Sequence, residues 1–411
     1  VIITCERFVT VFLMRTERMT QEWWRDAVIY QIYPRSFQDD NGDGIGDLPG
    51  ITRRLDFVAS LGVDAIWLSP FFTSPDLDMG YDVSNYTDVN PLFGTLDADW
   101  YVWADPKADG TAPNNWLSVF GGSAWQFDTR RKQYFMHNFL TAQPDLNFHN
   151  PEVVDALLET MRFWLERGVD GFRLDTVNFF VHDKQLRNNP SSGWTHFPNN
   201  PYEAQDQIYS KSQPENLDVL RKMRNLTNEY EDRMMVGEVG EMGRQIDIMA
   251  EYTSGGDKLH MAYSFEFLSH EHSAEHFRSR IAKFLDKAPD GWPCWSFSNH
   301  DVQRHVTRWT PEGGDEDAVA KQSIAMLCSL PGTLNIYQGE ELGQTETDIL
   351  FDELKDTANI DFWPEYKGRD GCRTPLVWEA DQPNAGFSTG EPWLPIKAPQ
   401  ASRAADLQEA A

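Results

Sequence analysis

The sequence has few cysteines, and they lie far apart along the chain. Only four occur among 411 residues, at Cys5, Cys294, Cys328 and Cys372. None lies at the short spacing of a metal-binding cysteine pair, and the number is too low for a disulfide-rich fold. Such sequences are typical of reducing compartments, so we expect a cytoplasmic protein.

Basic residues are scarce compared with acidic ones. Lys and Arg number 36 against 64 Asp and Glu, which gives a formal net charge of −28. A negative field of this size repels nucleic acid and anionic membranes, so neither is expected as a partner. No run of about 18 apolar residues occurs, so no membrane-spanning helix is predicted. The short apolar run near the start lacks the features of a signal peptide, and we interpret residues 1–22 as a tail outside the fold.

Short apolar segments that read as strands alternate with amphipathic segments that read as helices. A clear helical segment covers residues 151–168, begins after Asn150 with Pro151, and ends at Gly168. This alternation predicts a parallel β/α architecture. The predicted strands cover residues 27–33, 64–70, 169–175, 233–239, 261–267, 294–300 and 333–339.

Polar residues end nearly every predicted strand, which favours a barrel over a doubly wound sheet. In a (β/α)₈ TIM-type barrel those strand ends meet at one rim, where the active site lies. We therefore predict an α/β protein with such a barrel, incomplete because only seven strands are found and the third is missing. The barrel is expected over 23–96 and 149–397, interrupted by an irregular subdomain over 97–148, with a short tail over 398–411.

Three acidic residues at predicted strand ends are the strongest functional signal. Asp175 closes GFRLDTVN, Glu238 lies in GEVGE, and Asp301 follows FSNH. Hydrolysis of a glycoside with retention needs one carboxylate as nucleophile and one carboxylic acid that later acts as base. Arg173 lies two residues before Asp175, faces the same side of the strand, and can keep the nucleophile ionised.

These three motifs resemble those of the α-amylase superfamily, family 13 of the glycoside hydrolases. The segment DAVIYQIYPRSFQDDNGDGIGDLPGI over 26–51 resembles the opening of bacterial oligo-1,6-glucosidases and α-glucosidases. The resemblance implies a retaining α-glucosidase that acts on small oligosaccharides. By it, Asp175 is the nucleophile with Arg173 as its partner, and Glu238 is the acid/base. Asp301 then stabilises the transition state, and His300 donates a hydrogen bond to the sugar.

The resemblance also implies further sugar contacts. In MGYDVSNY (79–86) it makes Tyr81 a platform under the glucose ring and Asp82 a ligand of its hydroxyls; an ordinary loop pair is the alternative. In GRDGCRTPLVW (368–378) it makes Arg373 a further glucose ligand, with a purely structural arginine as the alternative.

A loop near the start has oxygen-bearing side chains at alternate positions, like the first part of an EF-hand loop. Gly50 stands where that loop has its Glu, so the EF-hand is not complete. The family resemblance places a structural Ca²⁺ here, or Mg²⁺ in some members; a metal-free turn is the alternative. The implied ligands are Asp39, Asn41, Asp43, the Ile45 carbonyl and Asp47.

Thr176 follows Asp175, the nucleophile that the resemblance implies, and bears on which glycosidic linkage is cleaved. In relatives, Val at this position goes with α-1,6 bonds, and Thr or Ala goes with α-1,4 bonds. The resemblance therefore implies that this chain removes terminal α-1,4-linked glucose from short, maltose-like substrates. Transfer of the glucose to another hydroxyl uses the same chemistry.

The chain also departs from the family pattern. NPLFGTL (90–96) runs directly into DADWYVWADP (97–106), so the family's second helix, third strand and an Asp/His motif are missing, and no C-terminal β-domain is found. A barrel that lacks one strand has unpaired strand edges, which predicts low stability and weak activity. One alternative is therefore an inactive deletion fragment. Another is a non-catalytic binding relative, although such proteins lack the catalytic acids found here and carry a membrane anchor.

Overall fold

The computed structural model describes residues 2–4, 22–86, 100–193, 200–241, 243–356 and 362–409. Two sheets are present in this part of the chain, one of eight strands and one of three. In the large sheet the strands follow the order β10-β11-β2-β3-β1-β7-β8-β9. Its strands are β1 (Ile2–Thr4), β2 (Val28–Ile32), β3 (Ala65–Leu68), β7 (Gly171–Leu174), β8 (Met234–Val239), β9 (Met261–Ser264), β10 (Cys294–Ser296) and β11 (Thr333–Tyr337).

The seven strands expected from the sequence are all confirmed, and neighbours among them pair in parallel. An isolated parallel bridge between Ala262 and Pro293 also joins β9 to the residue before β10, the two ends of the sheet order. This contact brings the edges of the sheet together, as in a (β/α)₈ barrel.

The eighth position is filled in a way that the sequence analysis did not anticipate. Ile2–Thr4 lies between β3 and β7 and pairs antiparallel with both, with Ile2 opposite Trp67 and Gly171. Part of the segment expected to lie outside the fold is therefore a strand of the sheet. It occupies the position of the missing third strand, since a free sheet edge is a favourable site for strand addition. The expected junction at 96–97 lies outside the described residues.

Helices cover the large sheet, and their ends follow local rules. The start predicted at Pro151 is confirmed, because the Asn150 side chain accepts a hydrogen bond from the Glu152 amide (3.0 Å) and caps α2. Gly168 follows the last turn with φ of 90°, in the left-handed region. The helices are α1 (Leu48–Ser60), α2 (Pro151–Glu166), α3 (Asn216–Thr227), α4 (Gln245–Thr253), α5 (Ala274–Lys287), α6 (His305–Trp309), α7 (Glu316–Leu327), α8 (Asp370–Arg373), α9 (Ala398–Ala401) and α10 (Ala405–Glu409).

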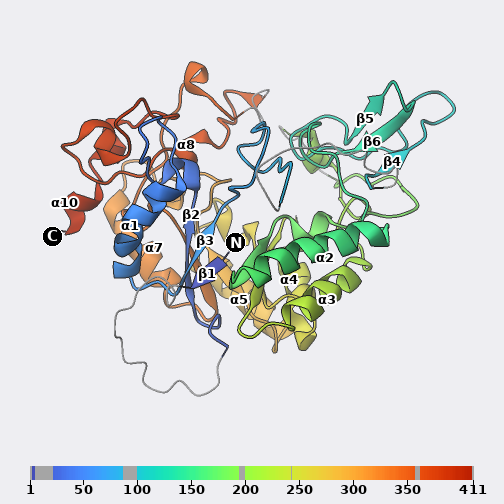
Figure 1. The fold of residues 1–411 in the computed structure, drawn as a ribbon, viewed down its shortest axis with the longest axis horizontal. Helices are drawn as coiled ribbons and strands as arrows, with labels where there is room; N and C mark the ends of the chain where they lie inside the picture. Colours follow the sequence, from blue (N-terminus) through green and yellow to red (C-terminus); the bar gives the residue numbers. More distant parts are fainter. Residues whose placement is uncertain are drawn as a thin grey trace.

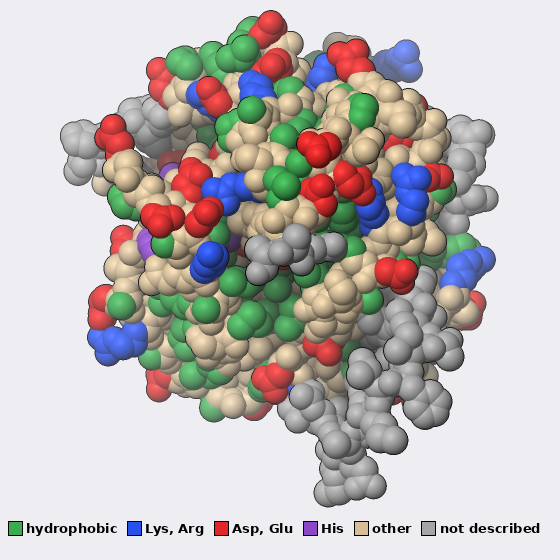
Figure 2. All heavy atoms as spheres, turned by 90° about the vertical axis from the view of Figure 1, so that its left-hand side faces the viewer, with side chains coloured by type: hydrophobic (Ala, Val, Ile, Leu, Met, Phe, Trp, Pro, Cys, Tyr) green, Lys and Arg blue, Asp and Glu red, His purple; other side chains and the backbone are tan. Residues whose placement is uncertain are grey.

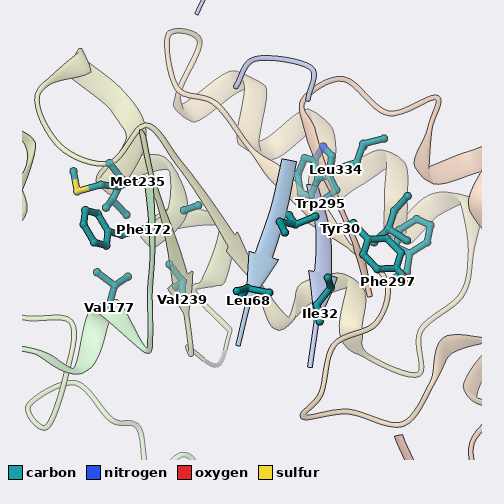
Figure 3. Close-up of a cluster of buried hydrophobic side chains, with 14 of the residues drawn as sticks. Tyr30, Ile32, Leu68, Phe172, Val177, Met235, Val239, Trp295, Phe297 and Leu334 are labelled. Atoms are coloured by element: carbon teal, nitrogen blue, oxygen red, sulfur yellow. The ribbon is translucent and has the colours of Figure 1, made fainter. Parts of the chain in front are cut away.

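The alternation of side chains along each strand divides the core in two. Tyr30, Ile32 and Leu68 belong to the large cluster that also includes helix residues, and Figure 3 shows part of this cluster beside the strands. Ile29 and Trp67, one position away, belong to a smaller cluster of strand residues on the opposite face. Gln31, Arg173 and Glu238 are in phase with this second cluster by strand register, so the interior of the barrel carries the polar groups of the site.

The inserted subdomain forms the three-stranded antiparallel sheet, ordered β4-β6-β5, which projects at the upper right of Figure 1. Trp116 and Trp125 lie in its own small core, with stacked rings 6.0 Å apart between centroids. Its strands are β4 (Trp103–Ala104), β5 (Trp125–Asp128) and β6 (Gln133–Met136).

The segment expected as a C-terminal tail packs against the rest of the protein. Ala404 and Ala405 are buried, and the backbone amide of Ala405 donates to the Val377 carbonyl (3.1 Å). Acidic side chains are scattered over the face in Figure 2 rather than gathered in one patch. Among the described residues, no helix combines the length and apolar character needed to cross a bilayer.

Candidate active site

The three acidic residues found in the sequence meet around a group of arginines at the carboxyl ends of the barrel strands. Asp175 directly follows β7, Glu238 lies near the end of β8, and Asp301 follows β10. Arg173 lies against Asp175 and Glu238, and Arg369 and Arg373 lie against Asp301. The predicted convergence on one rim is therefore confirmed.

Arg173 joins the first two acids. Its Nη1 contacts Oδ1 of Asp175, and its Nη2 lies 2.7 Å from Oε1 of Glu238. A guanidinium can bind two carboxylates only if they lie side by side, so the two acids share one small space. Thr176 adds a further link, because its left-handed backbone (φ 37°) points its amide at Oε2 of Glu238 (3.1 Å).

The two acids differ in their access to solvent. The Asp175 side chain is 48% exposed, whereas that of Glu238 is 2% exposed. Burial raises the pKa of Glu238 to about 8; Arg173 opposes this shift, while the charges of Asp175 and Asp301 add to it. Glu238 is therefore protonated at neutral pH beside an open carboxylate, the division of roles that a retaining glycosidase needs.

Asp301 lies in the opposite electrostatic environment. Burial tends to raise its pKa, but His300 and the guanidinium groups of Arg369 and Arg373 together hold it below its ordinary value. Oδ1 accepts from Arg373 (3.0 Å) and from Arg369 (3.2 Å). Asp301 therefore stays ionised in the pH range where Glu238 is protonated.

His300 is neutral and oriented by its neighbours. Burial lowers its pKa to about 3. The Gln31 amide donates to Nδ1 (2.9 Å), so the ring proton is on Nε2, which lies 3.2 Å from Oδ2 of Asp301. Tyr81 stacks on the imidazole with ring centroids 5.0 Å apart and planes 10° apart, and Tyr33 stacks with centroids 5.7 Å apart. Two residues predicted to bind sugar, Tyr81 and His300, are thus brought together.

Asp82 does not lie where the sequence analysis expected. Its Oδ1 accepts from Ser74 Oγ (2.6 Å) and its Oδ2 accepts from the Leu77 amide (2.8 Å), so it stabilises its own loop. Asp78 instead reaches the site, because its Oδ1 accepts from Nη2 of Arg369 (2.7 Å). The other terminal nitrogen of Arg369, Nη1, donates to Asp301 (3.2 Å). Asp78 lies one residue before the MGYDVSNY segment and Asp82 lies within it, and sequence spacing gave no means to choose between them.

Arg373 also differs from its predicted role. Its side chain is fully buried and donates to the His300 carbonyl (2.7 Å) and to Asp301. It therefore holds Asp301 in place from the buried side and is not exposed to contact a sugar. Arg369, in the same motif, contacts Asp78, Asp301 and Asp356, and is the arginine that the sequence analysis missed. The arginine-carboxylate pairs of this loop involve residues far apart in the chain, so no local pattern identifies them.

Tyr263 is the other residue that was missed. It lies opposite Glu238 in the β8–β9 register, and its hydroxyl donates to Oε1 of Glu238 (2.8 Å). The alternation of the predicted strand 261–267 places Tyr263 on the inner face, so this contact was accessible from the sequence once neighbouring strands were aligned.

The loop with the predicted metal ligands forms a series of tight turns. Asp39 accepts from the Gly42 and Gly44 amides (both 2.8 Å), Asn41 Oδ1 accepts from Asp43 (2.8 Å), and Asp43 Oδ1 accepts from Ile45 (2.9 Å). Asp47 caps α1 instead, accepting from the Gly50 amide (2.7 Å). In the described part of the chain, no group of three or more His, Cys, Asp or Glu side chains is placed so that it could hold a metal ion. The Ca²⁺ site therefore stays a prediction.

Comparison with known proteins agrees with this geometry. A probable alpha-glucosidase of Rhizobium meliloti (strain 1021) is 53% identical over 439 residues, which cover 95% of this chain and 80% of that protein. An oligo-1,6-glucosidase of Parageobacillus thermoglucosidasius is 34% identical over 92% of this chain and 79% of its own. The crystal structure of an alpha-glucosyl transfer enzyme superposes with a TM-score of 0.89 at 47% identity, over 95% of this chain and 82% of that one.

The model of the alpha-amylase catalytic domain matches residues 31–98 and 97–409. The two matched pieces meet at the point where the sequence analysis locates the missing third strand. Together they cover nearly all of the sheet and each of the three acids. The chain therefore belongs to the alpha-amylase catalytic-domain family.

Proposed function

We propose that this protein is a retaining α-glucosidase that removes terminal glucose from short oligosaccharides. The observation that carries the proposal is the contact of one guanidinium, that of Arg173, with both Asp175 and Glu238. Relatives named alpha-glucosidase and oligo-1,6-glucosidase support the hydrolytic activity. The same groups can pass the glucose to the hydroxyl of a second sugar, and a relative described as an alpha-glucosyl transfer enzyme supports this side reaction.

The reaction follows from the placement of the two acids and from the proton that Glu238 retains. The Asp175 carboxylate attacks C1 of the glucose, while Glu238 gives its proton to the oxygen of the leaving sugar. A covalent glucosyl-enzyme results, and the displaced sugar leaves as an alcohol. Glu238, now ionised, takes a proton from water, whose oxygen attacks C1 and releases Asp175. Asp301 and the Nε2 proton of His300 are available to bind sugar hydroxyls as charge develops at C1.

The assembled acids favour an active enzyme over an inactive fragment or a non-catalytic relative. We place the protein in the cytoplasm, since Cys294, Cys328 and Cys372 are free thiols and the sequence holds one further cysteine. A small neutral oligosaccharide is the expected ligand. Neither nucleic acid nor membrane suits a surface with net charge −28.

Replacing the nucleophile tests the proposal directly. Asp175→Asn is expected to lower turnover of maltose by about 10³-fold or more, because no carboxylate remains to form the covalent intermediate. The measurement is release of glucose from maltose and isomaltose, with the first anomer formed by the unaltered enzyme identified as α by NMR. Asp155→Asn, on the exposed face of α2, is the matched control and should keep full activity. Equal activity of both variants would exclude Asp175 as nucleophile.

The raised pKa of Glu238 sets the basic side of the pH profile. Because its pKa is about 8, the acid form is present at neutral pH and is lost as the pH rises. We expect kcat/KM for maltose to fall above a midpoint near pH 8. Glu238→Gln should remove this limb and most of the activity toward maltose. A basic limb that persists in Glu238→Gln would assign it to another group.

The linkage preference is proposed to depend on Thr176. Thr176→Val keeps a β-branched side chain at the same left-handed backbone position, so the change is confined to a hydroxyl. We expect the ratio of isomaltose to maltose kcat/KM to rise severalfold. Thr176→Ala is the control and should keep the preference for maltose. An unchanged ratio in Thr176→Val would separate the linkage preference from this position.

Calcium in the Asp39–Asp47 loop is proposed from the oxygen-rich spacing and from the family resemblance. Asn41 and Asp43 each accept a single described hydrogen bond, which leaves lone pairs for a cation. We expect millimolar Ca²⁺ to raise the melting temperature relative to the chelated protein, and Asp43→Asn to reduce that rise. Identical melting temperatures with Ca²⁺ and with chelator would leave the loop as a metal-free turn.

A further inference from the structure

Tyr263 is a buried phenol in direct contact with both groups that control proton transfer. It pairs with Glu238 in the β8–β9 register, and its side chain is almost fully buried. Its hydroxyl lies 2.8 Å from Oε1 of Glu238, 2.9 Å from Nη2 of Arg173 and 3.2 Å from Nε of Arg173. The roles proposed for Asp175, Glu238 and Asp301 do not explain why a phenol lies at this position.

The direction of these hydrogen bonds follows from the chemistry of the partners. A guanidinium has only donors, so Arg173 donates to the Tyr263 oxygen. The single phenol proton can then go only to Glu238 Oε1. Burial raises the pKa of Tyr263 well above its ordinary value, although Arg173 opposes this, so the phenol keeps its proton.

The two oxygens of Glu238 are therefore not equivalent. Oε1 accepts a hydrogen bond from the Tyr263 hydroxyl and lies 2.7 Å from the cationic Nη2 of Arg173. Among the described residues, Oε2 has the Thr176 amide as its one hydrogen-bond donor (3.1 Å). A protonated carboxyl group places its hydrogen on the oxygen with fewer donors, because an O–H pointing at a donor loses its acceptor.

We infer that Tyr263 is a positioning residue that, with Arg173, directs the acidic proton of Glu238 to Oε2 and fixes that oxygen toward the leaving sugar. This inference rests on the proposed function, since it concerns the acid of that reaction. Tyr263 does not touch the reacting atoms; it acts through Glu238. It lies on β9, whereas Glu238 lies on β8 and the other two acids follow β7 and β10.

Two substrates with different leaving groups distinguish a positioning role of Tyr263 from a purely structural one. A sugar alcohol is a poor leaving group and needs protonation, whereas p-nitrophenolate leaves with little help. Tyr263→Phe keeps the ring and removes one hydroxyl. We expect kcat/KM for maltose to fall about tenfold or more, and that for p-nitrophenyl α-glucoside to change less than about threefold.

The pH profile gives a second readout. The phenol hydrogen bond favours the ionised form of Glu238, so its loss raises the pKa of Glu238 further. The basic limb of kcat/KM for maltose should therefore move to higher pH in Tyr263→Phe. Site-specific 3-fluorotyrosine at position 263 strengthens the donor and should move the limb to lower pH, which keeps the test available if the Phe variant folds poorly. The charged and titratable groups that face Glu238 are Arg173, Asp175, Tyr81, Tyr263 and Asp301.

Tyr252→Phe is the matched control. Tyr252 is equally buried, and its hydroxyl accepts from Asn216 Nδ2 (2.8 Å) at a site apart from the acids. The loss of this bond should lower the melting temperature without altering the ratio of the two substrates or the pH limb. If Tyr263→Phe lowers kcat/KM equally for both substrates and leaves the basic limb of the pH profile unchanged, Tyr263 is only a packing residue.

Failure of the inference can be told from failure of the proposed function. If Glu238→Gln keeps full activity on maltose, the assignment of the acid is wrong, and the inference falls with it. If Glu238→Gln is inactive on maltose while Tyr263→Phe behaves like Tyr252→Phe, only the inference is overturned. In the Glu238→Gln background, Tyr263→Phe should not change the substrate ratio further, because the proton that it directs is gone.

Discussion

The site depends on one buried cation that two carboxyl groups share. Arg173 is 4% exposed, and a guanidinium so far from water is stable only with negative or polar partners around it. Those partners are Asp175, Glu238 and the Tyr263 hydroxyl, while the face of Trp67 lies 4.9 Å from the guanidinium carbon. Arg173 therefore does more than pair with one carboxyl group, since it holds Asp175 and Glu238 next to each other and orients both.

The cluster around Asp301 also consists of carboxyl groups and arginines, but there the carboxyl group is charged, whereas Glu238 keeps its proton. Asp301 is held by two arginines and lies beside the His300 imidazole, so its charge is favoured despite burial. Glu238 shares a single arginine with Asp175, so desolvation prevails and its proton is retained. The ratio of cations to carboxylates, rather than depth alone, decides which acid is charged. Two carboxyl groups near each other can thus hold different protonation states at one pH.

The strands and the three acidic residues at their ends were predictable because strand patterns are local. Period-two alternation and polar strand ends located β7 and β8, and with them Arg173, Asp175 and Glu238. The loop residues were less accessible. Asp78 and Asp82 lie four residues apart, and only the position of Arg369, far along the chain, separates their roles. The same holds for Arg369 and Arg373, whose partners are set by how the loop after β11 folds back over Asp301.

The position between β3 and β7 shows why the site is assembled although the family's third strand is missing. Ile2–Thr4 pairs through three residues with β3 and through one with β7, so the join to β7 is the weaker one. Arg173, Glu238 and Tyr263, however, lie on β7, β8 and β9, which pair with each other through four residues at each step. The relative placement of Arg173, Glu238 and Tyr263 is thus fixed within three neighbouring parallel strands. Asp301 is joined to them through the bridge between Ala262 and Pro293, on the side of the barrel away from β1. Replacement of the third strand therefore bears on the stability of the barrel more than on the geometry of proton transfer.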